Sequence, residues 1–281
     1  MNFFKKLFGA RNTPEPQSPE PVASPETAAQ KLNYDDLTEA EAANHAACMA
    51  SAQCLDRHWQ TVGTVERDVL SYIISPSFSG GPDWPSTRQA YRVVRRDHAI
   101  VLATDGLSDP FDDAEGLGNG FEMELFLETS DIPEHARGVL GEIDPLKQSW
   151  AFELIEHVAK TVANAGGITH QLDRHGVLSL ELPGFSQSHH MSDQLPPLFV
   201  TEDDATGVLL GGPDPDFPTR LDDMPLSPVR LVPVVLITAS ELEYVRTGGR
   251  EVREDLVSRL KAAGIGHTSS LRRTSVVLLS P

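Results

Sequence analysis

The spacing of apolar residues predicts four amphipathic helices after about residue 32. They cover 38–59, 146–165, 240–247 and about 250–263. The first opens with Thr38 followed by Glu41, and the third with Ser240 followed by Glu243. Both pairs have the spacing of a capping box, in which each residue satisfies a backbone N–H of the other. We therefore expect well-defined starts for these two helices.

Short apolar runs between the helices predict strands. The candidates are 69–74, 89–95, 98–104, 120–128, 177–182, 198–200, 208–210, 231–237 and 274–279. The second and third flank Arg96 and Asp97 and suggest a hairpin. Segment 120–128 alternates apolar residues with glutamates, which predicts a half-buried strand with one face in water. Pro233 suggests an edge strand or a bulge for 231–237. Together the segments predict an α+β fold, with a mixed, mostly antiparallel sheet packed with helices.

Before the first helix the composition changes twice. Residues 1–10, MNFFKKLFGA, form a short basic and aromatic tip. Residues 11–31 are rich in Pro, Glu and Ser, which predicts a disordered tether, and 32–281 is the folded domain with its N-terminal helix. The tip could place one apolar face on a membrane surface or a partner, but two helical turns are too short to anchor firmly. A membrane-surface-tethered adaptor is therefore one alternative function.

Charge and cysteine content limit the classes of function. The 281 residues carry a formal net charge of -18, which makes non-specific nucleic-acid binding improbable because a phosphate backbone would be repelled. The same charge could attract a basic protein or simply keep the chain soluble. There are only two cysteines, Cys48 and Cys54, and no secretory signal or long apolar stretch. These features predict a cytoplasmic protein.

Several segments resemble the suppressor-of-fused-like domain. They are YRVVRRDHAIVLATDGLSDPF (91–111), GFEMELFLETSD (120–131), LLGGPDPDF (209–217) and LVPVVLITASELEYVRTGG (231–249). The resemblance covers roughly 55–264 and implies an α+β protein-binding module. In animals the related protein clamps a transcription-factor peptide by strand addition, and bacterial relatives are often immunity proteins of toxin systems. The resemblance thus implies a non-enzymatic module of bacterial type that binds and neutralises a toxin.

An acidic loop offers the main alternative. Asp105, Asp109, Asp112 and Asp113 form a carboxylate cluster in a glycine-bearing loop, and carboxylates at such spacing could hold a metal ion for a hydrolase. The spacing does not match an EF-hand, and aspartates are also common as turn caps in solvated loops. The chain has no nucleophile elbow and no phosphate-binding loop. We therefore assign no catalytic, cofactor or metal residue.

Partner contacts are predicted at two aromatic residues and five acidic ones. The residues are Trp84, Asp105, Asp109, Phe111, Asp112, Asp214 and Asp216. Trp84 lies in a predicted loop, where it would either anchor an interface or fold back over the sheet. Asp214 and Asp216 alternate with prolines, which would either present acids rigidly to a basic partner or form an ordinary connection.

Overall fold

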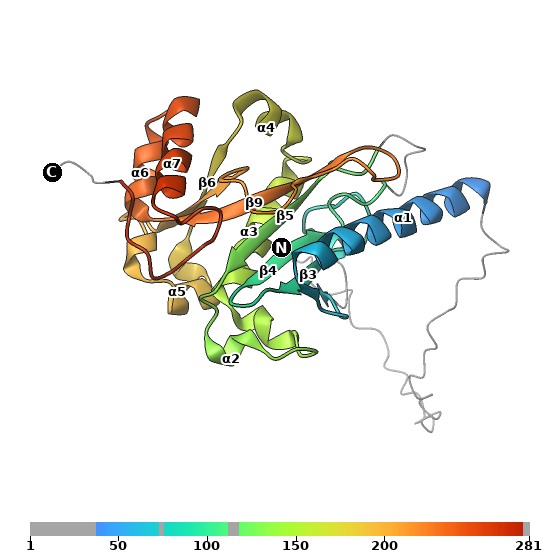
Figure 1. Cartoon of the computed structure of the whole chain (residues 1–281), viewed down its shortest axis with the longest axis horizontal. Coiled ribbons are helices and arrows are strands. Elements are labelled where there is room, and N and C mark those ends of the chain that lie inside the picture. The colour runs from blue at the N-terminus through green and yellow to red at the C-terminus, as the bar shows by residue number, and fades with distance from the viewer. Residues whose placement is uncertain (1–37, 73–75, 112–117, 278–281) are drawn as a thin grey trace, which may run out of the picture. The chain divides into compact units, whose positions relative to one another are not determined.

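A computed structural model describes residues 38–72, 76–111 and 118–277, and in these ranges a nine-stranded sheet lies between helices (Figure 1). The predicted tip, 1–10, and the predicted tether, 11–31, lie outside the described residues. So do Asp112 and Asp113 of the acidic loop.

The first helix confirms its capping prediction. Helix α1 spans Glu39–Val62, and the Thr38 hydroxyl accepts a hydrogen bond from the Glu41 N–H while the Glu41 carboxylate accepts one from the Thr38 N–H. Its buried side chains begin at Ser51 and include Cys54, Leu55 and Trp59, so its C-terminal half is the part that packs on the sheet.

Two other helices start at residues that differ from the predicted ones. Helix α3 spans Trp150–Asn164, because 144–148 forms a 3-10 turn and Ser149 caps the helix. Helix α6 spans Ala239–Arg246, and its capping box is Thr238 with Glu241, not Ser240 with Glu243. Thr238 still has the extended backbone of the preceding strand, which an N-cap requires, whereas Ser240 is already helical.

The remaining helical elements are short, apart from one. They are η2 (Pro76–Ser79), α2 (Glu134–Arg137), η3 (Asp144–Gln148), α4 (Thr169–His175), η4 (Phe185–Gln187), α5 (His190–Gln194), η5 (Pro197–Phe199) and the longer α7 (Arg250–Ala262). Element η5 lies where a strand was predicted over 198–200, so that prediction is wrong. Pro196 and Pro197 start a 3-10 turn there.

The strands form one continuous order. They are β1 (Thr64–Val65), β2 (Leu70–Ser71), β3 (Ala90–Arg95), β4 (Ile100–Asp105), β5 (Met123–Thr129), β6 (Leu178–Pro183), β7 (Ala205–Leu210), β8 (Arg220–Leu221) and β9 (Val229–Ile237). The order is β1-β3-β4-β5-β9-β7-β6, with β2 on β3 and β8 on β9. Within the described residues only β5 and β9 pair in parallel, so the prediction of a mixed, mostly antiparallel sheet is confirmed. The predicted strand 274–279 is not found over 274–277, and its last residues are not described.

The predicted hairpin is confirmed as β3–β4. Val93 lies opposite Leu102, and the Arg96 N–H donates to the Ala99 carbonyl at 2.9 Å. This bond closes the turn around Asp97 and His98, and neither residue has a positive φ, so the turn needs no glycine.

Strand β5 corrects the prediction of a face in water. All its residues are buried, and Glu124 and Glu128 are only 0% and 6% exposed. One face packs on α3, and the other meets α1, where Phe126 lies edge-on to Trp59 at 6.0 Å. The second helical layer covers the face that the alternation assigned to solvent.

Strand β9 is central, so the edge or bulge expected from Pro233 is wrong. On one side it pairs with β5. On the other it pairs with β8 through Val229–Arg230 and with β7 through Val234–Ile237. Pro233 lies where the pairing with β7 ends, and its carbonyl still accepts a hydrogen bond from the Gly211 N–H at 3.1 Å, so the missing N–H costs at most one ladder bond.

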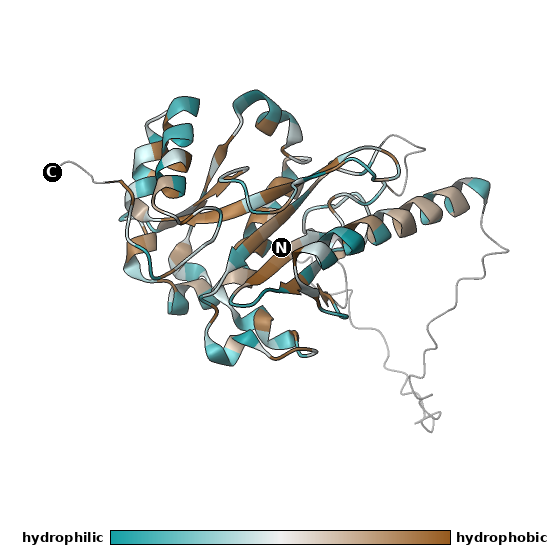
Figure 2. Ribbon diagram, in the orientation of Figure 1, coloured by the Kyte–Doolittle hydropathy of each residue, from teal (hydrophilic) through white to brown (hydrophobic). Residues whose placement is uncertain are grey.

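Three apolar clusters hold the layers together. The largest lies between α3 and one sheet face, the second between α1 and the β3–β4–β5–β9 part of the other face, and the third under α6 and α7. Figure 2 shows the central strands as the most hydrophobic part of the fold and α7 as largely hydrophilic on its outside. Both faces of the sheet are thus protected, which leaves its two edges as the exposed backbone.

Candidate interaction site

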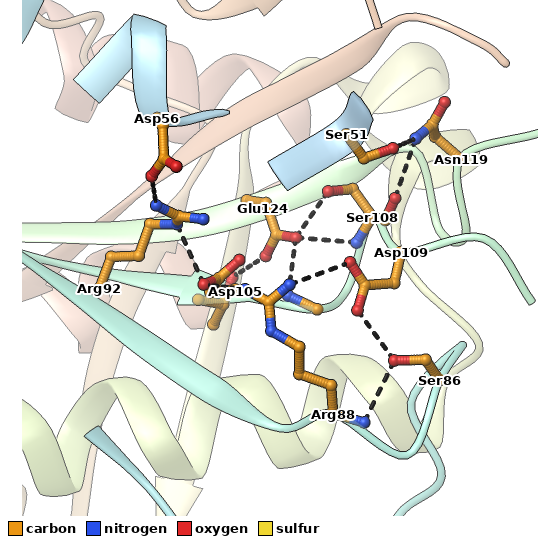
Figure 3. A network of polar contacts seen from close by, with 12 residues as sticks. Ser51, Asp56, Ser86, Arg88, Arg92, Asp105, Ser108, Asp109, Asn119 and Glu124 are labelled. Atoms are coloured by element: carbon orange, nitrogen blue, oxygen red, sulfur yellow. Dashed lines mark hydrogen bonds and ion pairs between the residues drawn. The ribbon is translucent and has the colours of Figure 1, made fainter. Parts of the chain in front are cut away.

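Asp105 and two arginines form the centre of a buried polar network (Figure 3). Asp105 ends β4, is fully buried, and forms ion pairs with Arg88 and with Arg92, whose Nε lies 3.0 Å away. Arg92 lies on β3 and also pairs with Asp56 of α1. The network therefore joins the helix to β3 and to the end of β4.

Asp109 belongs to the same network. It is 3% exposed, accepts a hydrogen bond from the Ser86 hydroxyl at 2.8 Å, and lies 3.7 Å from Arg88. Burial raises the pKa of Asp109 above its ordinary value, although the Arg88 charge and the Ser86 hydrogen bond act in the opposite direction.

Glu124 of β5 is the most strongly perturbed carboxyl of the network. One of its oxygens accepts hydrogen bonds from the Gly106 N–H, the Ser108 N–H and the Ser108 hydroxyl, at 3.1, 2.8 and 2.6 Å. The other accepts from Thr104. Complete burial raises the pKa of Glu124 to about 7, despite the hydrogen bonds from Ser108 and Thr104, and the nearby Asp105 adds to the rise.

This geometry favours a structural role for the predicted acidic loop. The hydrolase alternative requires carboxylates that face a cleft, whereas Asp105, Asp109 and Glu124 turn inward, Asp105 and Asp109 onto arginines. Among the described residues no group of three or more His, Cys, Asp or Glu side chains could hold a metal ion. The network instead fixes the strand ends and the start of the following loop.

The other predicted partner contacts lie apart from one another. Trp84 is 6% exposed and packs edge-on against Tyr91 at 5.9 Å, so it covers the sheet and does not anchor an exposed interface. Phe111 is part-exposed beside Phe121, and Asp112 is not described. A partner would not touch the buried Trp84, Asp105 and Asp109 in this conformation.

Asp214 and Asp216 do lie at the surface. Asp214 pairs with Lys261 at 3.1 Å, and Asp216 forms two hydrogen bonds with Arg96, at 3.0 and 2.7 Å. Each of the two acids already neutralises a cation of this chain. Their contribution to partner binding stays a prediction.

Strand β6 provides an exposed strand edge. It pairs with β7 on one side, and among the described strands none pairs with its other side. The Gly184 N–H donates to the Asp204 carbonyl, and the Gly211 N–H donates to the Pro233 carbonyl. With this register, the backbone N–H and C=O groups of the even-numbered residues of β6 face β7. Ser179 and Glu181 therefore turn their backbone N–H and C=O groups outward, and Pro183, which has no N–H, ends the edge.

An acidic cluster lies beside this edge. Arg246 of α6 binds Glu181 at 2.8 and 2.6 Å, Asp203 at 3.1 and 3.0 Å, and also Glu243. The hydrogen bonds that Arg246 donates to Glu181 are the largest of the causes that raise the pKa of Arg246 above its ordinary value. A groove of about 590 Å³ adjoins the cluster, and its lining includes Glu202, Asp203, Glu243 and Arg246.

Sequence reasoning did not find this surface. Strand 177–182 was predicted and is confirmed as β6, but its position at the end of the sheet was not. The proline after an alternating strand was the available signal, because strand edges tolerate proline and central positions usually do not.

A mixed sheet, covered on both faces and open at an outer strand, defines an α+β scaffold suited to interaction through an edge. Residues 89–274 match the model of the family described as Suppressor of fused protein (SUFU). The chain belongs to this family, as the resemblance of its segments predicted. Membership supports a protein-interaction module.

No curated protein and no solved structure matches the sequence. Within the described part of the chain, no helix has the length and apolar character needed to cross a membrane.

Proposed function

We propose that this chain is a non-enzymatic protein-binding module that adds an extended segment of its partner as a strand to β6. The observation that carries the proposal is the outer edge of β6, where Ser179 and Glu181 present unpaired backbone donors and acceptors. Strand addition derives affinity from such groups, while neighbouring pockets select the side chains of the incoming segment.

The charges beside the edge favour a basic segment. Glu181, Asp203 and Glu243 pair with one cation, Arg246, and Glu202 also lines the groove. A lysine or arginine of the partner would meet excess negative charge there, and the attraction would speed its encounter. A second copy of the chain would instead bring the same acids against each other.

The finer proposal is an immunity protein of bacterial type that acts in the cytoplasm and neutralises a toxin domain. Family membership and the net charge of -18 support it. Toxin capture through β6 requires no bond chemistry, which agrees with the inward-facing carboxylates of the acidic loop. Co-expression with a toxin encoded by a neighbouring gene would test this role directly, since survival should require a functional β6 edge.

Ser179→Pro is expected to abolish partner binding. The proline removes an outward N–H but leaves the β6–β7 hydrogen bonds, which come from even-numbered residues. The full chain, used as bait in the native host at physiological salt, should recover a specific protein, and Ser179→Pro should recover at least about tenfold less of it, since more than 1.4 kcal/mol of binding would be lost.

Ser179→Thr is the matched control, because threonine keeps the N–H and suits a strand. It should retain the partner, and all three proteins should melt at similar temperatures. Equal recovery by Ser179→Pro would contradict binding at β6, and recovery of no specific protein would contradict the function itself.

A further inference from the structure

A pocket of about 690 Å³ lies at the end of the sheet opposite β6. Two chain segments line it, 68–72 around β2 and 141–147, which includes most of η3. Among the described strands β2 pairs only with β3, and it is two residues long. The pocket is therefore formed mainly by the segments that flank these short elements.

The loop 138–142, between α2 and η3, leads into the pocket and has a fixed backbone. The Arg95 guanidinium donates to three successive carbonyls at its start, of which that of Val139 is the nearest at 2.9 Å. The Gly141 N–H donates to Glu66 at 3.0 Å. Arg95 and Glu66 form an ion pair, and their side chains are only 16% and 2% exposed. A mostly buried ion pair thus determines the shape of the loop.

The tip of this loop is apolar and exposed. Val139 and Leu140 are 62% and 67% exposed, and Val69, which lines the pocket, is 39% exposed. Single exposed apolar residues are common, but two adjacent ones on a loop with a fixed backbone, next to a pocket, indicate an interaction surface. We call the pocket, Val69 and the loop tip the β2 surface.

The charge of the β2 surface favours a basic partner. Asp68, Glu142 and Asp144 line the pocket together with one cation, Lys147, which pairs with Asp144 at 2.9 Å. Within the described residues, neither Asp68 nor Glu142 has an ion-pair partner. A lysine or arginine of a partner would therefore meet uncompensated negative charge, whereas the same surface of a second copy would bring like charges together.

A partner has to meet this surface with side chains. The N–H groups of Gly141 and Glu142 and the carbonyl of Val139 already have hydrogen-bond partners within this chain. Strand addition needs a run of free donors and acceptors, which the two residues of β2 do not supply. A helix satisfies its own backbone hydrogen bonds and presents apolar and basic side chains at spacings of three and four residues.

We propose that the β2 surface is a docking site for a basic amphipathic helix of a partner protein. Apolar side chains of the helix pack on Val69, Val139 and Leu140, and a lysine or arginine enters the pocket toward Asp68 and Glu142. The site is separate from β6 and does not depend on the function proposed there. The two ends of the sheet can thus hold two partner segments at once.

A labelled helical peptide, with leucines at helical spacing and lysines at the other positions, is the probe. Fluorescence anisotropy should show at least about tenfold weaker binding to the full chain carrying Leu140→Ser than to the unaltered chain, because an interface anchor is lost. Leu226→Ser is the matched control. Leu226 is 40% exposed but does not line the pocket, so its loss should leave the affinity unchanged. Ser179→Pro should also bind the probe normally, because its change is confined to β6.

The charges have a test of their own. Asp68→Asn combined with Glu142→Gln should weaken the probe about fivefold, and a peptide with glutamates in place of the lysines should not bind. The proposal is overturned if the unaltered chain does not bind the probe, or if Leu140→Ser binds it as tightly as Leu226→Ser does. It is also overturned if light scattering shows a dimer that Leu140→Ser dissociates, because a second copy then covers the surface.

A titration of the unaltered chain followed by amide NMR needs no variant. The probe should shift the amide signals of Val69 and Leu140 and leave that of Ser179 in place, because Ser179 lies at the other end of the sheet. Shifts that leave Leu140 unaffected would place the peptide elsewhere and overturn the proposal.

Discussion

Replacing Asp105 with asparagine is expected to lower the free energy of unfolding by about 3–5 kcal/mol, the usual cost of removing one partner from a buried ion pair. Asp105 is fully buried and neutralises both Arg88 and Arg92. Asparagine keeps the shape but removes the charge, so Arg92, whose side chain is 7% exposed, would lose its buried carboxylate partner and retain Asp56, which is 46% exposed. Urea denaturation at pH 7, followed by circular dichroism, measures the loss.

Asp214→Asn is the control for this substitution. Asp214 is 73% exposed and pairs with Lys261, so its loss should change stability by no more than about 0.5 kcal/mol. A loss below about 1 kcal/mol for Asp105→Asn would show that the network does not hold the strand ends together. Turnover of a substrate that disappears in Asp105→Asn, with stability unchanged, would contradict a non-enzymatic protein.

Sequence patterns correctly predicted those elements that are determined by residues close together in the chain. The Thr38–Glu41 capping box, the β3–β4 hairpin and most of α3 follow from spacing within a few residues, and the structure contains all three. The misplaced start of α6 has the same origin. Two capping pairs of equal spacing overlap there, and only the end of β9 decides that Thr238 is the cap.

Alternation could not distinguish β5 from a strand with a wet face. Its glutamates point away from the face of Met123, Leu125 and Leu127, which is the normal pattern for an antiparallel strand with one face in water. Glu124 and Glu128 are nevertheless buried, because α1 covers this face and because each glutamate finds distant partners, Thr104 and Ser108 for one and Arg96 for the other. Charge patterning within one strand contains no information about these partners.

The acids of the buried network and of the β6 edge show the same limit. Asp105 and Asp109 suggested a solvated loop, because Arg88 and Arg92 lie earlier in the chain and their pairing with these acids depends on the register of β3 and β4. Glu181 and Arg246 are 65 residues apart and meet only because β6 and α6 lie side by side in the fold. The family resemblance predicted the class of fold and interaction correctly, but the edge itself is a consequence of sheet order.

Stability is expected to fall as the pH rises from about 4.5 to about 7, through the titration of Glu124. Burial raises the pKa of this carboxyl to about 7 in the folded chain, whereas the unfolded chain releases the proton near 4.5. Between these values the native state binds more protons than the unfolded state, so the free energy of unfolding decreases with pH. The shift corresponds to about 3 kcal/mol, which is fully lost above pH 7.

Glu124→Gln should remove this component. Glutamine can accept the N–H groups of Gly106 and Ser108 through its oxygen, and it carries no charge at any pH. Relative to the unaltered chain, the variant should therefore gain about 3 kcal/mol in unfolding free energy between pH 4.5 and pH 8, measured by urea denaturation at both values. A difference between the two proteins that does not change with pH would contradict a neutral Glu124 in the fold at low pH.

Glu153→Gln provides a control with the opposite sign. Burial acts to raise the pKa of Glu153, but backbone N–H groups of 189–191 outweigh it and hold the pKa below its ordinary value. The stability that Glu153 contributes is present above the unfolded pKa and is lost as the pH falls. Glu153→Gln should therefore be most destabilising at pH 8, and in acid its free energy of unfolding should approach that of the unaltered chain. Glu124→Gln should show the reverse, with its stability rising relative to the unaltered chain as the pH increases. Both substitutions change the net charge equally. Opposite pH trends for Glu124 in its strand and Glu153 in its helix would therefore assign each effect to the surroundings of that glutamate and not to net charge.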